Sequence, residues 1–366
     1  MNRPSDLACM EMAYGLAEKA RGRTSPNPLV GAVVVRNGRV VGCGFHEEAG
    51  KPHAEILALR TAGARAEGAT LYLTLEPCVH WGRTPPCVDT VIAAKLARAV
   101  ISAIDPNPLV HTKGVRKLRE AGLEVAVGLL EKRNARMNEA YAKYITRKIP
   151  FITLKAALTL DGKIACRTGD SKWISSAGTR DYVHLLRGEQ DAVMIGVNTL
   201  LVDDPLLTVR HPNWGAKEIV RIVLDSRLRF PLSAKILSTL PRGRVIVFAG
   251  RGAAAAKARA LEARGVEVVF PAGGKKTWPL PDVLGELGKR EVAALLVEGG
   301  SRLFTAFVEE GLADKAVLTY APRVLGGRTA PGLVGGRVVD KVSRALALKN
   351  MRSFSVEDDI ILEGYF

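Results

Sequence analysis

The sequence predicts a two-domain α/β protein, and three observations carry that prediction. The chain has 366 residues, whereas single domains mostly have about 100–200 residues. Its composition, with 47% hydrophobic and 25% charged residues, is that of a globular chain and excludes a fibre or a long disordered tail. Helical and extended hydrophobic patterns alternate along the chain, as expected for layered α/β domains.

The first domain is expected to span residues 1–148. An amphipathic helix over 7–21 precedes two strands, 30–35 and 40–45, which the hairpin signal Asn37-Gly38 joins. The patterns that follow predict a helix over 54–66, a strand over 70–75, a helix over 88–96, a strand over 99–104, and a further short helix, strand and helix up to about Arg147.

The second domain is expected to span residues 149–366. Its boundary is placed at Lys148-Ile149-Pro150, where a charged helix ends and a new apolar strand, 151–157, begins. Further strands are expected near 191–195, 219–225, 244–249, 266–270, 292–297 and 315–320, with helices near 177–188, 252–264, 281–289 and 301–310. This alternation predicts a mostly parallel sheet with helices on both faces.

Composition also limits the partners and the location of the chain. No apolar run is long enough to span a bilayer, and the first ten residues lack the apolar core of a signal peptide, so a cytoplasmic protein without membrane contact is expected. The net charge of +16 is shared by both domains rather than concentrated in an arm, which favours small phosphorylated ligands over a nucleic-acid surface. Five cysteines in such a chain do not make a disulfide framework, and some are candidate metal ligands.

One His and two Cys in the first domain are candidate ligands of a catalytic zinc ion. His53 opens a predicted helix, and Cys78 and Cys87 follow a strand and begin the next helix. Three protein ligands are the number that a catalytic zinc keeps while its fourth position is left for water. Glu55, two residues after His53, is placed to move protons without binding the metal, as in zinc-dependent nucleobase deaminases.

Two other interpretations of these residues remain open at this point. Buried cysteines are commonly small hydrophobic residues without a metal. His80 is a candidate fourth ligand, which would close the site and make the zinc structural.

The first domain resembles a known family in three segments. These are 24–31 (Thr-Ser-Pro-Asn-Pro-Leu-Val-Gly), His53-Ala54-Glu55, and the stretch from Glu76 to Cys87 with its long Gly-Arg-Thr-Pro-Pro insertion. They resemble the deaminase domain of the RibD family of bifunctional riboflavin biosynthesis proteins. The resemblance implies a cytidine-deaminase-like three-layer domain with zinc on His53, Cys78 and Cys87. It also implies that Glu55 shuttles protons and that Asn27, His80 and Arg83 bind the pyrimidine substrate and its ribose phosphate.

Two strand-to-helix loops are the candidate ligand-binding segments of the second domain. An ordinary Gly-x-Gly-x-x-Gly fingerprint is absent after its first strand. Instead, Glu298-Gly299-Gly300-Ser301 follows a strand and opens a helix, where backbone N–H groups favour phosphate. Gly196 to Thr199 follows another strand and continues into the segment 203–210. Both loops are expected at the carboxyl ends of parallel strands, where open α/β sheets bind ligands.

Together with the segments 155–165 and 171–175, these loops resemble the reductase domain of the same family. The resemblance implies a dihydrofolate-reductase-like fold in which NADPH reduces the ribosyl group of the deaminated pyrimidine to a ribityl chain. It implies Asp203 and Lys155 as the polar groups nearest the chemistry. Cofactor contacts are expected from Ala157, Trp173, Thr199, Asp203, Ser226, Gly300, Ser301 and Arg302. Substrate contacts are expected from Ser171, Arg187, Leu207, Arg210 and Glu298, with the two arginines suited to the phosphate.

We therefore expect a deaminase and reductase of riboflavin biosynthesis that uses Zn²⁺ and NADPH and acts on a small phosphorylated pyrimidine. The family suggests a homo-oligomer, a dimer or tetramer, through the second domain, with the expected strands near 314–320 and 356–364 as candidates for the interface. A nucleic-acid-directed deaminase is the alternative enzyme, because its zinc chemistry is the same. A regulator with a structural zinc is the alternative without catalysis, and metal removal would separate the two.

Overall fold

The computed structural model describes residues 5–81, 86–215, 217–336 and 339–366. The chain divides into two compact units, Met1–Lys148 and Ile149–Phe366, which we call the first and the second unit. Both contain a sheet covered by helices, which confirms the predicted α/β class.

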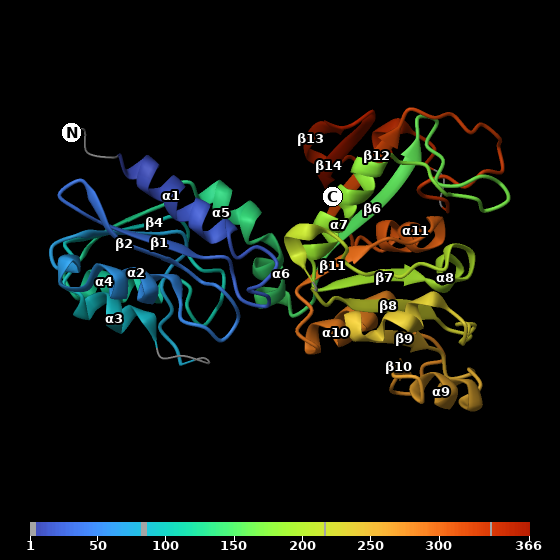
Figure 1. The fold of residues 1–366 in the computed structure, drawn as a ribbon, viewed down its shortest axis with the longest axis horizontal. Helices are drawn as coiled ribbons and strands as arrows, with labels where there is room; N and C mark the ends of the chain where they lie inside the picture. The colour runs from blue at the N-terminus through green and yellow to red at the C-terminus, as the bar shows by residue number, and fades with distance from the viewer. Residues whose placement is uncertain (1–4, 82–85, 216, 337–338) are drawn as a thin grey trace. The chain divides into compact units, whose positions relative to one another are not determined.

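The first unit is a five-stranded sheet in the order β2-β1-β3-β4-β5 (Figure 1). β1 runs antiparallel to β2 and β3, whereas β3, β4 and β5 are parallel. In chain order its elements are α1 (Asp6–Glu18), β1 (Gly31–Arg36), β2 (Arg39–Phe45), α2 (Ala54–Ala62), the 3₁₀ helix η1 (Gly63–Ala66), β3 (Thr70–Leu73), α3 (Cys87–Ala93), β4 (Arg98–Ile101), α4 (Lys113–Glu120), β5 (Glu124–Val127), α5 (Glu131–Met137) and α6 (Glu139–Arg147).

Helices cover both faces of this sheet and make three layers. α1 and α5 lie on one face and α2, α3 and α4 on the other (Figure 1). Two glycines of β2 bring α2 close to the sheet: a Cβ at Gly42 would lie 2.2 Å from the Ala58 carbonyl oxygen, and one at Gly44 would lie 2.6 Å from that of Ala54. Any side chain at these two positions would collide with the backbone of α2. The glycines therefore allow α2 to pack directly on the sheet.

The second unit contains a nine-stranded sheet with its helices. Its elements are β6 (Phe151–Thr159), α7 (Ala177–Gly188), β7 (Ala192–Gly196), α8 (Val197–Asp203), η2 (Pro212–Trp214), β8 (Val220–Asp225), η3 (Lys235–Arg242), β9 (Val245–Ala249), α9 (Ala255–Glu262), β10 (Val266–Val269), α10 (Leu280–Lys289), β11 (Ala294–Val297), α11 (Ser301–Glu309), β12 (Lys315–Ala321), η4 (Val342–Arg344), β13 (Lys349–Val356) and β14 (Asp359–Tyr365). None of the described helices of the chain combines the length and the apolar character that crossing a membrane requires.

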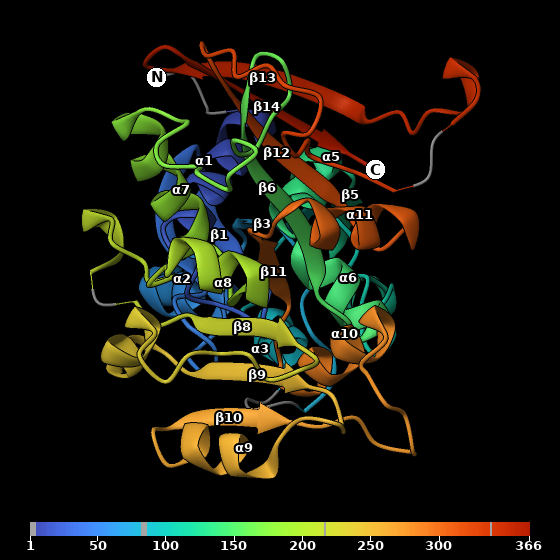
Figure 2. The same cartoon turned by 90° about the vertical axis from the view of Figure 1, so that its right-hand side faces the viewer.

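The sheet order is β10-β9-β8-β7-β11-β6-β12-β14-β13, so β10 and β13 form its two edges (Figure 2). The strands from β10 to β12 are parallel, and only β14 and β13 run antiparallel to their neighbours. The carboxyl ends of β8, β7, β11 and β6 therefore lie side by side at one edge of the sheet, where ligand-binding loops are expected.

Three local details differ from the sequence prediction. The segment after β7 forms a short helix, α8, rather than a loop. The helix expected over 54–66 ends at Ala62, because Gly63 takes a positive φ of 56° and the chain continues as a 3₁₀ turn. β13, whose residues are mostly exposed, gave no clear alternation and was not predicted as a separate strand.

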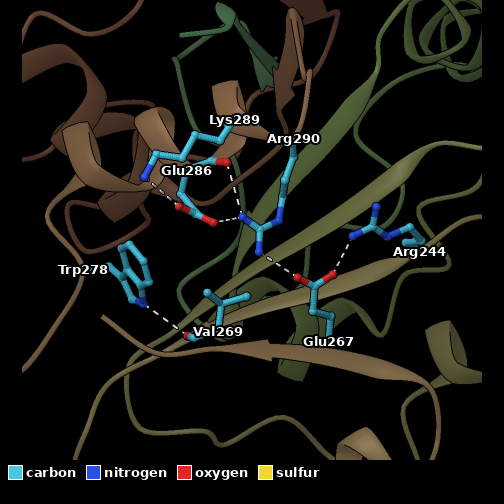
Figure 3. Close-up of polar contacts among 7 residues, drawn as sticks. All are labelled: Arg244, Glu267, Val269, Trp278, Glu286, Lys289 and Arg290. Carbon is cyan, nitrogen blue, oxygen red and sulfur yellow. Dashed lines mark hydrogen bonds and ion pairs between the residues drawn. The ribbon is translucent and has the colours of Figure 1, made fainter. Parts of the chain in front are cut away.

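An ion-pair network fastens the edge strand β10 at the amino ends of the strands (Figure 3). Glu267 of β10 accepts hydrogen bonds from Arg244, which precedes β9, at 2.6 Å and from Arg290, which follows α10, at 2.7 Å. Arg290 and Lys289 also pair with Glu286. At the carboxyl end of β10 the Trp278 indole donates to the Val269 carbonyl at 3.2 Å. The ion pairs lie at the opposite ends of the strands from the candidate ligand-binding loops.

Candidate active sites

The three candidate metal ligands of the first unit lie together. The ligand atoms of His53, Cys78 and Cys87 are all within 4.8 Å of one another. His53 Nδ1 lies 3.0 Å from the Cys87 sulfur and 3.7 Å from the Cys78 sulfur. His53 is the N-cap residue of α2, and Cys87 is the first residue of α3, so two helix starts and the loop after β3 build the cluster.

Glu55 lies in the first turn of α2, beside this cluster. Its side chain is only 3% exposed, and burial raises the pKa of its carboxyl group above the ordinary value, although His53 opposes the shift. A buried carboxyl group with a raised pKa exchanges protons more readily near neutral pH than an exposed one. The site thus combines a soft ligand set with a candidate proton carrier.

His80 is not part of the ligand cluster. Its Nδ1 atom is buried and has no hydrogen-bond partner within the described residues, and no other His, Cys, Asp or Glu in the described part of the chain joins the three ligand atoms. An open, three-ligand site is therefore the arrangement that these residues offer. Arg83, the other predicted contact from this segment, lies outside the described residues.

Asn27 reaches the site through His46. The Asn27 side-chain amide lies 3.1 Å from His46 Nε2, and the His46 ring packs edge-on against that of His53 with centroids 5.2 Å apart. His46 Nδ1 is in turn 3.2 Å from the Pro52 carbonyl oxygen. His46 was not predicted, because nothing in its sequence neighbourhood marks it; the contact arises only when β2 packs beside the start of α2.

Two buried acids near Cys78 were also missed by sequence reasoning. Asp105, after β4, accepts hydrogen bonds from the Tyr141 hydroxyl at 2.9 Å and the Asn107 backbone at 2.8 Å. Burial raises the pKa of Asp105 to about 6. The available signal was the loop segment Asp105-Pro106-Asn107-Pro108, which follows a buried strand.

Glu76 anchors the loop that carries Cys78. Its carboxylate, 4% exposed, accepts backbone N–H groups from Asp105 at 3.2 Å, Thr112 at 3.0 Å and Val115 at 2.9 Å. It thereby ties the segment before Cys78 to the loop after β4 and to the start of α4.

The predicted residues of the second unit gather at the carboxyl ends of its parallel strands. Glu298 follows β11, α8 with Thr199 and Asp203 follows β7, and Ser226 follows β8. Lys155 and Ala157 lie on β6, the neighbour of β11. The strand order therefore brings together segments up to 143 residues apart in the chain, from Lys155 to Glu298.

A buried ion pair forms the centre of this group. Arg187 of α7 donates from Nε and Nη2 to the two carboxylate oxygens of Glu298 at 2.9 and 3.0 Å, and from Nη1 to the Thr208 carbonyl at 2.7 Å. The side chains of Arg187 and Glu298 are only 8% and 13% exposed. Burial lowers the pKa of the neighbouring Lys155, with Glu298 opposing and Arg187 reinforcing that shift.

Asp203 is held by the segment that precedes α7. The Ser171 hydroxyl donates to Asp203 Oδ1 at 3.0 Å, and Lys172 Nζ donates to the Asp203 carbonyl at 2.6 Å. Trp173, which is 63% exposed, lies under the guanidinium of Arg180 at 4.7 Å. The predicted substrate residue Ser171 thus lies directly beside α8, whereas the predicted cofactor residue Trp173 contacts α7.

The helix start at Ser301 also lies beside α8. A Cβ on Gly300, the N-cap residue of α11, would be 3.7 Å from Thr199 Oγ1, so the two predicted cofactor-binding loops are neighbours. Arg302 is exposed in the first turn of α11, whereas Leu207 is buried with a positive φ of 54°. Arg210 is exposed and donates to Thr208 Oγ1 at 3.0 Å.

Comparison with known proteins agrees with both units. Residues 3–103 match the family model of the cytidine and deoxycytidylate deaminase zinc-binding region, and residues 150–362 match that of the RibD C-terminal domain. The chain is 45% identical to the riboflavin biosynthesis protein RibD of Aquifex aeolicus over 99% of both chains. It is 38% identical to RibD of Escherichia coli, covering 88% of this chain and 91% of that one.

Solved structures show the same likeness over the whole chain. RibD of Acinetobacter baumannii superposes with a TM-score of 0.87 at 36% identity and 98% coverage of both chains. A diaminohydroxyphosphoribosylaminopyrimidine deaminase/5-amino-6-(5-phosphoribosylamino)uracil reductase from Thermotoga maritima superposes with a TM-score of 0.85 at 35% identity, again with 98% coverage of both chains. The predicted deaminase-like and reductase-like folds are thereby confirmed.

Proposed function

Because the chain belongs to the RibD family of riboflavin biosynthesis proteins, we propose an assignment of its two reactions to its two units. It is a bifunctional enzyme that deaminates and then reduces a pyrimidine. The first domain, 1–148, deaminates 2,5-diamino-6-ribosylamino-4(3H)-pyrimidinone 5′-phosphate. The second, 149–366, reduces the ribosyl group of the product to a ribityl chain. The juxtaposition of His53, Cys78, Cys87 and the buried Glu55 is the observation that carries this assignment.

Zinc fits the ligand set of the first unit. One imidazole nitrogen and two thiol sulfurs within 4.8 Å of one another suit a tetrahedral ion with one open position. Hydrogen bonding from Cys87 and His53 lowers the pKa of the Cys78 thiol, in favour of the thiolate that binds metal, whereas the same hydrogen bond and burial raise the pKa of Cys87. A zinc ion held there would act as a Lewis acid toward water and the pyrimidine.

Glu55 is the catalytic residue of the deamination. Its carboxylate takes a proton from the attacking water and, as the carboxylic acid, delivers a proton to the departing amine. The buried position of Glu55 keeps bulk water from competing for that proton. Asn27 and His80, with Arg83, bind the pyrimidine and its ribose phosphate.

The second unit orients a hydride transfer rather than supplying a nucleophile. NADPH, when bound, supplies the hydride. The loops around Thr199, Gly300 and Ser301 hold the cofactor, together with Ala157, Trp173, Ser226 and Arg302. Asp203, held by Ser171, and Lys155, beside Glu298, are the polar groups nearest the reacting sugar carbon. Positioning of this kind accounts for much of the rate in such reactions.

The substrate lies between α7 and the segment 207–210 in this proposal. Ser171, Arg187, Leu207, Arg210 and Glu298 are its contacts. The bidentate Arg187–Glu298 pair supports a role in which Arg187 orients Glu298, because two of its nitrogens are already committed to that carboxylate.

A coupled assay on the zinc-loaded chain tests the assignment. The diaminopyrimidinone ribosylamine phosphate is supplied with NADPH, and ammonia release and NADPH oxidation are followed separately. Release of ammonia with equimolar NADPH oxidation supports both reactions in one chain. Ammonia release without NADPH oxidation would contradict the assignment of a reductase to the second domain. The absence of both signals would contradict the whole proposal.

Removal of the metal separates the catalytic from the structural interpretation of the site. Chelation is expected to stop ammonia release while NADPH oxidation with pre-deaminated substrate and the circular dichroism spectrum stay unchanged. Unfolding of the first unit on chelation would instead indicate a structural zinc.

A homo-oligomeric state and a cytoplasmic location stay predictions. The strands β12 and β14 of the second unit are the proposed interface. Size-exclusion chromatography with light scattering on the full chain would distinguish a monomer from a dimer or tetramer.

A further inference from the structure

Asn138 is a buried amide side chain that the functions assigned above do not use. It lies at the junction of α5 and α6 and is 5% exposed. An Asn before the first turn of a helix commonly caps that helix with its side chain. Asn138 makes no such bond to α6, so both polar groups of its amide are available for another segment of the chain.

The amide of Asn138 bonds both backbone polar groups of a single residue, Leu29. Its Oδ1 accepts the Leu29 N–H at 2.8 Å, and its Nδ2 donates to the Leu29 carbonyl at 3.1 Å. A primary amide carries an acceptor and a donor in fixed geometry, so it satisfies a buried residue as a neighbouring strand would. Asn138 therefore fixes Leu29, 109 residues away in the chain, against the junction of the two helices.

A second buried amide supports this contact. Asn134 of α5 is 4% exposed, and its Oδ1 accepts a hydrogen bond from Asn138 Nδ2 at 3.4 Å. Its own Nδ2 donates to the carbonyl of Thr74, which follows β3, at 2.6 Å. The hydroxyl oxygen of Thr74 in turn accepts the Gly31 N–H at 3.0 Å. Buried side chains thus hold the segment at Leu29 and again at Gly31, where β1 begins.

Leu29 lies two residues after Asn27, the proposed substrate contact. Pro28 stands between them and restricts the backbone, so the position of Leu29 limits where Asn27 can lie. The Asn27 amide is 3.1 Å from His46 Nε2, and the His46 backbone N–H donates to the Val30 carbonyl at 2.9 Å. The contact between Asn27 and His46 therefore depends on the placement of the segment that Asn138 holds.

We propose that Asn138 is a positioning residue for the deamination, which holds Leu29 so that the side chain of Asn27 meets the pyrimidine beside His46. The inference rests on the proposed substrate contact of Asn27. In this role Asn138 touches neither the substrate nor a zinc ligand. It therefore affects how tightly the pyrimidine binds, and not the proton transfer by Glu55.

Steady-state ammonia release by the zinc-loaded full chain tests this role. Asn138→Leu keeps the branching of the side chain and removes both hydrogen-bonding groups. We expect its KM for the diaminopyrimidinone ribosylamine phosphate to rise about tenfold or more. The kcat and the bound zinc are expected to stay within about twofold of the parent. A purely structural role would lower the folded fraction, and so the apparent kcat, without changing the KM.

Asn138→Asp is the partial variant, and it keeps the test open if Asn138→Leu does not fold. A carboxylate accepts the Leu29 N–H but cannot donate to the Leu29 carbonyl, so an intermediate KM is expected. Thr146→Ala is the control, because Thr146 is exposed on α6 and bonds back to the Ala142 carbonyl of the same helix. NADPH oxidation with pre-deaminated substrate is expected to be normal in every variant.

A double variant shows whether Asn138 acts through Asn27. Asn27→Ala alone is expected to raise the KM. The KM of Asn27→Ala/Asn138→Leu is expected to match that of Asn27→Ala within about twofold, since a positioning residue has no effect once the group that it positions is gone. Multiplied effects of the two changes would overturn the inference. So would a fall in kcat alone, or an unchanged KM, for Asn138→Leu.

Failure of the proposed function gives different results. No ammonia release by the unmodified chain would contradict the deaminase itself, before any variant is measured. An unchanged KM for Asn27→Ala would contradict the substrate contact of Asn27, and with it the inference. If Asn27→Ala raises the KM and the Asn138 variants do not, the substrate contact stands and only the role of Asn138 is wrong.

Discussion

Arg187 and Glu298, 111 residues apart in the chain, form a bidentate ion pair in the interior of the second unit, with N···O distances of 2.9 and 3.0 Å. The pair joins α7 to the end of β11, where Lys155 and Arg210 also contribute to its electrostatic environment. The two buried hydrogen bonds fix the position of the Glu298 carboxylate more tightly than a contact between exposed side chains would.

Arg187→Met is expected to destabilise the second unit by about 3–5 kcal/mol, because it leaves the Glu298 carboxylate buried without its partner. Urea unfolding followed by the fluorescence of Trp173, Trp214 and Trp278 measures the loss. The double variant Arg187→Met/Glu298→Met is expected to recover most of the stability, since the unpaired charge is gone, but not NADPH oxidation. Equal stability of the single and double variants would argue that the pair is not electrostatically coupled.

Glu55→Gln is expected to abolish ammonia release, a loss of at least about a hundredfold, because the amide cannot carry the proton. Bound zinc, measured by atomic absorption, and NADPH oxidation with pre-deaminated substrate should stay normal. Deamination that survives this change would show that another group moves the proton.

Asp203→Asn is expected to have the opposite effect, with NADPH oxidation lost and ammonia release normal. The Ser171 hydroxyl can still donate to the amide oxygen of the variant, so the change removes charge more than structure. Separate assays of the two half-reactions measure this. A parallel fall of both rates would mean that the two sites are not independent.

Glu76→Gln is expected to destabilise the first unit by about 2–3 kcal/mol, because at least one of the three backbone N–H groups on this carboxylate loses its acceptor. Zinc affinity should fall with it, since Cys78 follows two residues later. The thermal midpoint and a zinc titration check both effects, with the exposed Glu67→Gln as control. A normal zinc affinity in the variant would show that Glu76 does not position the loop that carries Cys78.

Glu267→Gln is expected to cost about 1 kcal/mol of stability at pH 7 through loss of the network in Figure 3. Burial alone would raise the pKa of Glu267, but hydrogen bonds from Arg290 and Arg244 outweigh it and hold that pKa below the ordinary value. A depressed carboxyl pKa stabilises the fold above roughly pH 4.3, and the effect disappears as the pH falls further through the native-state pKa. The stability difference between variant and parent should therefore shrink between pH 7 and pH 3; a constant difference would mean that packing, not charge, is lost.

Local sequence was sufficient to predict those candidate site residues that lie within one short segment. His53 and Glu55 are two residues apart at a helix start, and the step from Cys78 to Cys87 lies between a strand and a helix. Both patterns predict the zinc ligands and the general acid. The alternation of helices and strands likewise predicted the two α/β units, because hydrophobic periodicity is a local property.

His46, Asp105, Tyr141 and Glu76 could not be found in the same way. Each is an ordinary residue in its own segment, and its importance arises from a partner in another, as with Asp105 and Tyr141 36 residues on. Burial decides their chemistry as well, since it raises the pKa of Asp105 and lowers that of His46.

The sequence by itself thus determined the α/β class and most element types, and it predicted the boundary near Lys148, the zinc ligands and the proton carrier. Only the tertiary structure decided which buried charges face one another and which donors are already committed. The physical reason is that periodicity and capping act over a few residues, whereas desolvation and charge pairing depend on strand order, which joins segments more than a hundred residues apart.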